Sequence, residues 1–233
     1  MRQWLTFNGK SSKDFGVYIS GLNTYNAPER DVEVLSIPGK NGDLTIDNGR
    51  YKNITVSYPA FIYDQFDQNI EGLRNYLLSQ SGYKRLEDTY HPEEFRLGRF
   101  RGEFSAKVVD WLEAGEFDLE FDCYPQRFLK SGEQPLTFTA AGAIHNEYMP
   151  SKPLIRAYGT GSFTISGVSV QITTANEYTD IDCELMEAYK GSTNCNGNIV
   201  LTNGIFPVLN QGDNSIGISG LTRIEIVPRW WIL

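Results

Sequence analysis

The sequence predicts a mainly β protein in two parts, a β-rich front half with one helix and an all-β back half. Three observations lead to this prediction. Aromatic residues make up 13% of the 233 residues and glycine occurs 22 times, and these residues suit half-buried pleated surfaces and tight turns. Apolar and polar residues alternate over many short stretches, and only one segment has convincing helical spacing. With 40% hydrophobic and 21% charged residues, the composition is typical of a soluble globular protein.

The front half contains stretches in which successive side chains separate into an apolar and a polar face, as they do in a half-buried strand. The clearest is EFDLEFDC, residues 116–123, and residues 54–60 and 99–108 alternate in the same way. Their apolar faces consist of Phe117, Leu119, Phe121 and Cys123; of Ile54, Val56, Tyr58 and Ala60; and of Phe100, Phe104, Ala106 and Val108.

Residues 36–53, SIPGKNGDLTIDNGRYKN, favour turns and strands over a phosphate site. Leu44 and Ile46 share one face, so a strand with one buried face is expected there. Pro38-Gly39-Lys40-Asn41-Gly42 predicts a long hairpin loop. Asp47-Asn48-Gly49 predicts a tight hairpin turn, because Asn-Gly tolerates the positive φ that such turns need. The G-x-x-G clamp of RNA-binding domains lies in a different context, so nucleic-acid binding is not favoured.

One helix is predicted between Asp64 and Gln80. Its apolar residues recur at spacings of four, three and four and therefore form one stripe. Asp64 or Asp67 is a candidate cap at its start, and Ser81-Gly82 is a candidate stop. The stripe consists of Phe66, Ile70, Leu73 and Leu77.

Prolines and small residues between Pro125 and Pro153 predict a linker, and we divide the chain into domains 1–132 and 133–233. Beyond the linker, short strands separated by turn signals predict a β-sandwich or jelly roll. The expected strands lie within 154–159, 162–166, 168–174, 179–186, 198–202 and 223–233, and the turns at 159–161, 196–198, 203–204 and 211–214.

Charge and cysteines limit the function classes. The net charge is −8, which repels nucleic acid and anionic lipid. Cys123, Cys183 and Cys195 form no C-x-x-C motif, and buried free thiols in a reducing cytosol are expected. The first residues lack the apolar core of a secretory signal and there is no spanning apolar run, so we expect synthesis in the cytosol and no membrane insertion.

No catalytic residue, metal site or cofactor is predicted. Carboxylates two apart on the strand at 116–122 lie about 7 Å apart, which is within the range for inverting glycosidases. A solvated strand face is the better interpretation, since nothing keeps one carboxyl protonated, and an acidic cavity or channel remains open. His91 and His145 form no metal motif, and no hydrolase triad is recognisable. These acidic side chains are Glu116, Asp118, Glu120 and Asp122.

Three further groups have structural interpretations. Strand alternation explains Asp180, Asp182 and Glu184 better than a calcium loop does. The basic cluster is interpreted as a salt-bridged strand face, since acids cancel its charge. Trp230 and Trp231 cannot both point to the core if they are strand neighbours, and packing or a partner contact is favoured over sugar binding. The basic cluster comprises Arg96, Arg99, Arg101 and Lys107, and its acids are Glu93, Glu94 and Glu103.

Six blocks in order along nearly the whole chain resemble the distal tail proteins (Dit) of long-tailed siphophages and related prophages. No single block is diagnostic, but the set is more specific than any short motif above. The blocks are FNGKSSKDFGVYISG (7–21), APERDVEVLSIPGKNGDL (27–44), GRYKNITVSYPAF (49–61), GYKRLEDTYHPEEFRLGRF (82–100), GEFDLEFDCYPQRFLKSGE (115–133) and RIEIVPRWWIL (223–233).

The resemblance implies an N-terminal belt domain, made of a β-sandwich, one α-helix and a β-hairpin, followed by a C-terminal galectin-like β-sandwich. It implies a hexameric ring at the virion tail tip that joins the major tail tube protein to the tail-associated lysin or hub protein, with a receptor-binding protein as a further candidate partner. DNA would pass through the lumen without specific binding.

The resulting hypothesis is a structural, non-enzymatic baseplate hub. A carbohydrate-binding adhesin of the tail tip is the alternative, and a glycoside hydrolase built on residues 116–122 comes third. In a ring, a projecting hairpin offers strand edges that a neighbouring subunit can cover, so residues 36–53 are expected to contact the adjacent protomer. The candidate contacts between protomers are Pro38, Gly39, Lys40, Asn41, Gly42, Asn48 and Gly49, and the candidate partner or sugar contacts are Trp230 and Trp231.

Overall fold

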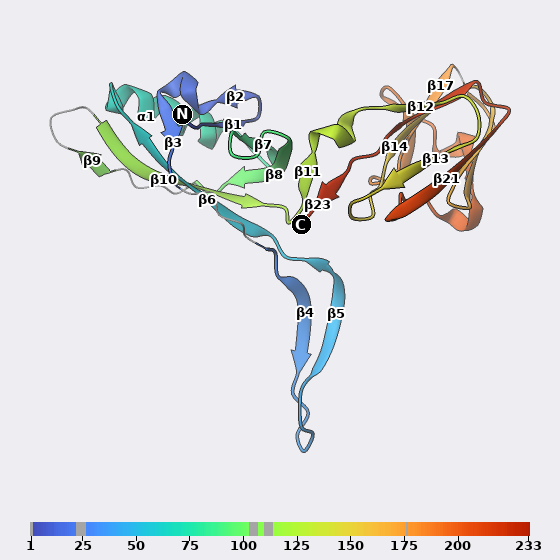
Figure 1. Ribbon diagram of the computed structural model, residues 1–233, viewed down its shortest axis with the longest axis horizontal. Coiled ribbons are helices and arrows are strands. Elements are labelled where there is room, and N and C mark those ends of the chain that lie inside the picture. Colours follow the sequence, from blue (N-terminus) through green and yellow to red (C-terminus); the bar gives the residue numbers. More distant parts are fainter. Residues whose placement is uncertain (1, 22–26, 103–106, 110–113, 176) are drawn as a thin grey trace. The chain divides into compact units, whose positions relative to one another are not determined.

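The computed structural model describes residues 2–21, 27–102, 107–109, 114–175 and 177–233 (Figure 1). The chain forms two compact units, residues 1–127 together with Leu233, and residues 128–232. Each unit has its own hydrophobic core of buried residues. The mainly β fold predicted from the sequence is confirmed, and the division into domains 1–132 and 133–233 stays a prediction.

Unit 1 is built on an antiparallel sheet in the order β2-β1-β7-β8-β10-β6-β3, with β9 on β10. The predicted strands at 54–60 and 116–123 are confirmed. They pair over nine residues, from Gly115 opposite Ile62 to Cys123 opposite Ile54. The strands are β1 (Leu5–Phe7), β2 (Lys10–Ser11), β3 (Val17–Ile19), β6 (Ile54–Ile62), β7 (Lys84–Asp88), β8 (Glu94–Phe100), β9 (Lys107–Val109) and β10 (Ala114–Cys123), with a 3-10 turn at Ser12–Phe15.

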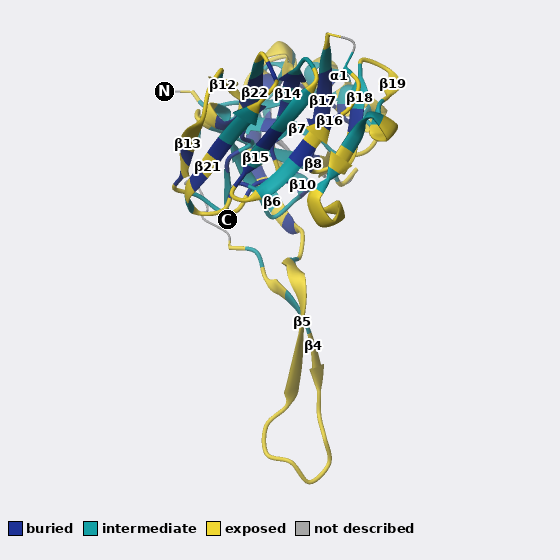
Figure 2. Cartoon of the chain, turned by 90° about the vertical axis from the view of Figure 1, so that its right-hand side faces the viewer, coloured by how far each residue is buried: buried dark blue, intermediate teal, exposed yellow. Residues whose placement is uncertain are grey.

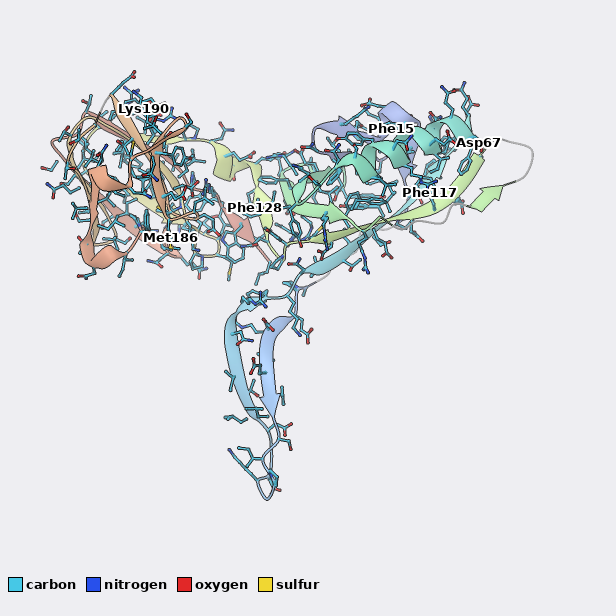
Figure 3. All side chains as sticks on the ribbon, turned by 180° about the vertical axis from the view of Figure 1, so that it is seen from behind. Phe15, Asp67, Phe117, Phe128, Met186 and Lys190 are labelled. Atoms are coloured by element: carbon cyan, nitrogen blue, oxygen red, sulfur yellow. The ribbon has the colours of Figure 1, made fainter. Side chains whose placement is uncertain are left out.

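The predicted helix is α1 (Phe66–Ser79), and its apolar stripe packs into the core of unit 1. Phe15 lies beside it, with its ring centroid 5.7 Å from that of Tyr76 (Figure 3). The cap prediction is wrong. The N-cap residue is Gln65, in the left-handed region and without a side-chain cap, and Asp67 already lies in the first turn. The chain thus enters the helix through a sharp turn, in which the Asn69 amide donates to the Asp64 backbone oxygen over 2.9 Å.

Two strands of unit 1, β4 (Arg30–Leu35) and β5 (Leu44–Tyr51), form a separate two-stranded sheet that extends away from the other strands (Figure 1). We call residues 29–52 the arm. The long loop predicted around Pro38–Gly42 is confirmed, since it connects β4 to β5. The tight turn predicted at Asn48-Gly49 is wrong. These residues lie inside β5. The pairing of β5 with β4 shifts register between Arg30 and Val32, and the positive φ of Gly49 belongs to this bulge.

Unit 2 contains two antiparallel sheets whose inner faces supply one core, in agreement with the predicted sandwich. One sheet has the order β12 (Leu136–Phe138), β22 (Arg223–Val227), β14 (Leu154–Tyr158), β17 (Tyr178–Asp182), β18 (Glu187–Lys190) and β19 (Thr193–Asn194). The other has the order β13 (Gly142–Asn146), β21 (Gly212–Ser219), β15 (Gly161–Ile165), β16 (Val168–Ile172) and β20 (Ile199–Leu201). Short elements are β11 (Arg127–Leu129), β23 (Trp231–Ile232) and 3-10 turns at Lys130–Glu133, Asn196–Asn198 and Thr202–Gly204.

Two expectations for the back half are wrong. The run from Pro125 to Pro153 is not a plain linker, because β11, β12 and β13 form within it. The turn expected at 211–214 is the start of β21 instead. The polar Asn214 is tolerated in this strand because its buried amide donates to the backbone oxygens of Asn210 and Gly212, at 2.8 and 3.0 Å.

The three cysteines are free. Cys123 and Cys183 are buried as expected, and burial raises the pKa of each thiol to about 12. Cys195 departs from the expectation, since it is only half-buried and sits at the end of a surface 3-10 turn. None of the described helices is long and apolar enough to cross a membrane.

Candidate assembly surfaces

The arm carries a row of exposed apolar side chains. They are between 42% and 59% exposed, although strands usually cover residues of this kind. Figure 2 shows exposure along almost the whole length of β4 and β5. Exposed apolar side chains gathered on one segment in this way mark an interaction site. The residues are Val34, Leu35, Ile37, Leu44 and Ile46.

The register of the arm divides these side chains between two faces. Leu35 pairs with Leu44 and Glu33 pairs with Ile46, and cross-strand partners lie on the same side of a sheet. One face therefore contains Glu33, Leu35, Leu44 and Ile46, and we call it the docking face. The opposite face contains Val32, Val34, Thr45 and Asp47.

The root of the arm is ionic where its outer part is apolar. Arg50 pairs with Asp31 at 2.6 Å, and Arg30 pairs with Asp47 at 3.1 Å. The hydrogen bond from Arg50 lowers the pKa of Asp31. A third cross-strand pair joins Lys52 to Glu29 at 3.3 Å. Charged side chains of this kind keep the root solvated and discourage other strands from pairing with its edges.

The contact residues proposed from the sequence do not form one patch. Pro38–Gly42 lies in the loop at the tip, whereas Asn48 and Gly49 lie in the bulge near the root. At the bulge, the Gly49 N–H donates to the Asp47 carboxylate over 2.7 Å and Gly49 takes a φ of +71°. The apolar residues Leu44 and Ile46 lie between these two places. They belong to the hairpin 36–53 that is expected to contact the neighbouring protomer, although they are not among the named candidate contacts, whereas Val34 and Leu35 lie on the preceding strand, outside that range.

The acidic face of β10 is solvated, as predicted. Glu116 and Asp118 are exposed, and Glu120 and Asp122 are half-buried. The last two have basic neighbours. Arg101 lies 3.7 Å from Glu120 and Arg99 lies 3.2 Å from Asp122. Asp122 also accepts a hydrogen bond of 2.7 Å from the Tyr83 hydroxyl. These contacts are those of a salt-bridged, solvated strand face.

The predicted basic cluster is divided by its strand. Arg99 and Arg101 make the salt-bridged face that was expected, but their partners are the acids of β10. Arg96 belongs to the opposite face, where burial lowers its pKa and one guanidinium nitrogen has no partner among the described residues. Glu94 pairs with Arg127 at 3.1 Å. Glu103 and the side chain of Lys107 lie outside the described part of the chain.

Asp180 and Asp182 share one face of β17, as alternation predicts, and they are both buried. Arg156 donates to both oxygens of Asp180 at 2.7 and 2.9 Å, and Arg229 to both oxygens of Asp182 at 2.8 and 2.7 Å. Glu184 pairs separately with Lys152. No group of three acidic, histidine or cysteine side chains among the described residues could hold a metal.

The two tryptophans have different environments. Trp230 is 8% exposed and belongs to the core of unit 2, where its ring centroid lies 6.1 Å from that of Tyr148. The backbone passes so close that a Cβ on Gly132 would lie 2.2 Å from the Trp230 nitrogen. Trp231 is half-buried, and its ring N–H donates to the Pro150 oxygen over 3.0 Å. Trp231 is therefore the one of the pair with ring surface available to a sugar or partner.

The described residues form two β-rich units, one α-helix and the arm, and comparison with solved structures shows that phage proteins share this fold. The crystal structure of the SPP1 Dit protein, described as a paradigm of the hub adsorption apparatus in phages that infect Gram-positive bacteria, matches with a TM-score of 0.72 at 13% identity. The match covers 96% of this chain and 97% of that one. The chain thus has the fold of SPP1 Dit.

Chains of the phage P2 baseplate in its activated conformation also match, less closely. The TM-score is 0.50 at 9% identity for the structure with calcium and 0.51 at 8% identity for the one with strontium. The matches cover 97% of this chain and 97% and 96% of those chains. No protein-family model and no curated protein sequence matches this chain.

Proposed function

We propose that this protein is a structural distal tail protein, the baseplate hub of a siphophage or prophage, and that it acts without enzymatic activity at the virion tail tip. The likeness to SPP1 Dit over nearly the whole of both chains supports this proposal most strongly. The six sequence blocks that resemble the distal tail family support it independently, because this resemblance lies in the amino-acid sequence alone.

The proposed assembly is a hexameric ring of this chain. The exposed apolar arm supports it, because a single copy leaves the two outer edges of β4 and β5 unpaired and their side chains uncovered. A contact that joins different surfaces of successive copies generates a ring when the rotation closes. In this ring, the arm of each protomer is covered by its neighbour.

The ring would join the major tail tube protein to the tail-associated lysin or hub protein, and it would let DNA through its lumen. The acidic face of β10 suits a lumen surface. Its two exposed carboxylates, Glu116 and Asp118, would repel the phosphate backbone, so a passing DNA would not adhere. A receptor-binding protein is a further proposed partner.

Mass measurement of the purified protein in solution, followed by electron microscopy, tests the ring. The wild type is expected as a six-membered ring, and the Leu35→Ser/Leu44→Ser variant as a folded monomer, since it removes apolar surface from the arm. Leu185→Ser is the matched control, because Leu185 is 62% exposed in unit 2 and should leave the ring intact. A wild type that stays monomeric at high concentration, even with tube and tip proteins present, would contradict the proposal.

A further inference from the structure

An aromatic patch on unit 1 is a second exposed apolar surface, separate from the arm. Tyr18 and Phe61 are cross-strand partners on β3 and β6, with ring centroids 6.0 Å apart. The rings of Phe61 and Tyr63 meet edge to face with their centroids 4.7 Å apart, and the Arg2 guanidinium lies 4.6 Å from the centroid of the Tyr63 ring and 5.2 Å from that of the Tyr18 ring. We call Arg2, Tyr18, Phe61 and Tyr63 the aromatic patch.

This patch is prominent in the surface of unit 1. Outside the arm, Tyr63 and Leu78 are the only large hydrophobic side chains among the described residues of unit 1 that are strongly exposed, at 50% and 52%. Leu78 stands by itself near the end of α1, whereas Tyr63 belongs to a cluster of three rings and a cation. Clustered aromatic residues with an arginine are the composition typical of interface centres.

The charges of the arm and of the patch complement each other. Arg2 contacts ring faces but forms no ion pair with any described residue, and Glu33, on the docking face of the arm, likewise has no ionic partner in the described part of the chain. Glu33 among Leu35, Leu44 and Ile46 and Arg2 among aromatic rings present opposite charges. Such matching fixes register and excludes wrong partners. The exposed Glu116, the cross-strand partner of Phe61, bounds the patch on the β10 side.

The topology places the two surfaces as a head-to-tail contact requires. The arm joins β6 at the end that begins with Ile54, and the aromatic patch lies at the end that finishes with Ile62. Nine residues of strand separate these ends by about 30 Å. Two different surfaces at opposite ends of one strand give a heterologous contact, which can repeat from copy to copy.

We propose that the docking face of the arm binds the aromatic patch of the neighbouring copy, with Glu33 paired to Arg2. This inference rests on the proposed ring and adds to it the surface that receives the arm. Leu35, Leu44 and Ile46 cover the rings of Tyr18, Phe61 and Tyr63, and the ion pair at the edge of the contact sets its register.

Charge exchange at the two exposed positions tests the proposal without disturbing a core. Glu33→Arg and Arg2→Glu are each expected to shift the assembly midpoint to at least about tenfold higher protein concentration, because each places like charges together. The combined variant Arg2→Glu/Glu33→Arg is expected to recover most of the loss. Mass photometry over a concentration series measures the midpoints, and circular dichroism checks that every variant is folded.

A second pair of variants separates this contact from others. Tyr63→Ala is expected to weaken assembly by at least about tenfold, as truncation of an interface aromatic does, and Leu78→Ala, with similar exposure, is expected to leave the midpoint unchanged. If the wild type forms no ring, the proposed function fails. If the ring forms but Leu78→Ala weakens it while Tyr63→Ala does not, or if the exchanged pair shows no recovery, only the inferred docking surface is overturned.

Discussion

The arm and the paired strands β6 and β10 have the same alternation of apolar residues, but in the single chain these residues are exposed on the arm and buried on β6 and β10. Leu119 and Phe121 on β10 are completely buried by the core of unit 1, whereas Leu44 and Ile46 on β5 remain more than 40% exposed. Alternation therefore predicts that a strand has an apolar face that must be buried, but it does not indicate whether the same chain or a second molecule buries it. Inside unit 1 the cover is local, and for the arm we propose a second copy.

The largest effect is expected when an apolar side chain is removed from β10, whose apolar face is buried in the core of unit 1. Leu119→Ala creates a cavity in the core of unit 1 and is expected to reduce the free energy of unfolding by about 2–5 kcal/mol. Urea denaturation of the monomeric protein, followed by circular dichroism, measures it. A loss below about 1 kcal/mol, the range of conservative core changes, would contradict a close-packed β6–β10 core.

A smaller loss of stability is expected when the buried carboxylate Asp182 of unit 2 is changed, and a still smaller one for the exposed carboxylate Asp47 of the arm. Asp182→Asn removes the negative charge and one of the two acceptors for Arg229, and it is expected to cost about 1.5–3 kcal/mol in the free energy of unfolding. Asp47→Asn, which breaks the exposed pair with Arg30, is the matched control and should cost at most about 1 kcal/mol. Equal losses in the two variants would contradict the difference in burial.

The cost at Asp182 should also depend on pH. Burial raises the pKa of Asp182, but the hydrogen bonds from Arg229 and from the Leu185 and Glu184 N–H groups outweigh this, so its net pKa is lowered from 3.8. A lowered pKa in the folded state contributes stability above the unfolded value, and this stability is lost as the pH falls through the folded value. The difference in unfolding free energy between wild type and Asp182→Asn is therefore expected to be constant near neutral pH and to shrink below about pH 4.

The smallest change in the free energy of unfolding is expected for a leucine of the arm. Leu44→Ala makes the same chemical change as Leu119→Ala, but on the arm, where the side chain is 42% exposed and lies outside the core of unit 1. The free energy of unfolding of the monomer is expected to change by less than about 0.5 kcal/mol, while assembly is weakened. A loss as large as that of Leu119→Ala would mean that the arm packs within its own chain.

The sequence was sufficient for elements whose determinants are local. Phe66, Leu73 and Leu77 predicted α1 because helical spacing needs no information from elsewhere in the chain. Period two identified β6 and β10 for the same reason. The N-cap of α1 was predicted wrongly, because Gln65 takes a left-handed backbone conformation that its residue type does not indicate.

Other features depend on partners distant in sequence, and these could not be predicted. Asn48-Gly49 suits a tight turn and a bulge equally well, and the choice is made by the pairing of β5 with β4. The burial of Asp182 follows from Arg229, 47 residues away. Likewise, nothing in the sequence brings Arg2 to Tyr63, because the bridge between Gln3 and Ile19 and the pairing of β3 with β6 place them together.

The three thiols differ in accessibility, and this difference allows the subunits of an assembly to be counted by chemical labelling. Cys123 and Cys183 stay protonated and enclosed, so a maleimide dye should react first with the half-buried Cys195. One fluorophore per chain converts subunit number into discrete photobleaching steps. The stoichiometry of a single particle could then be recorded inside an intact tail, without an engineered tag.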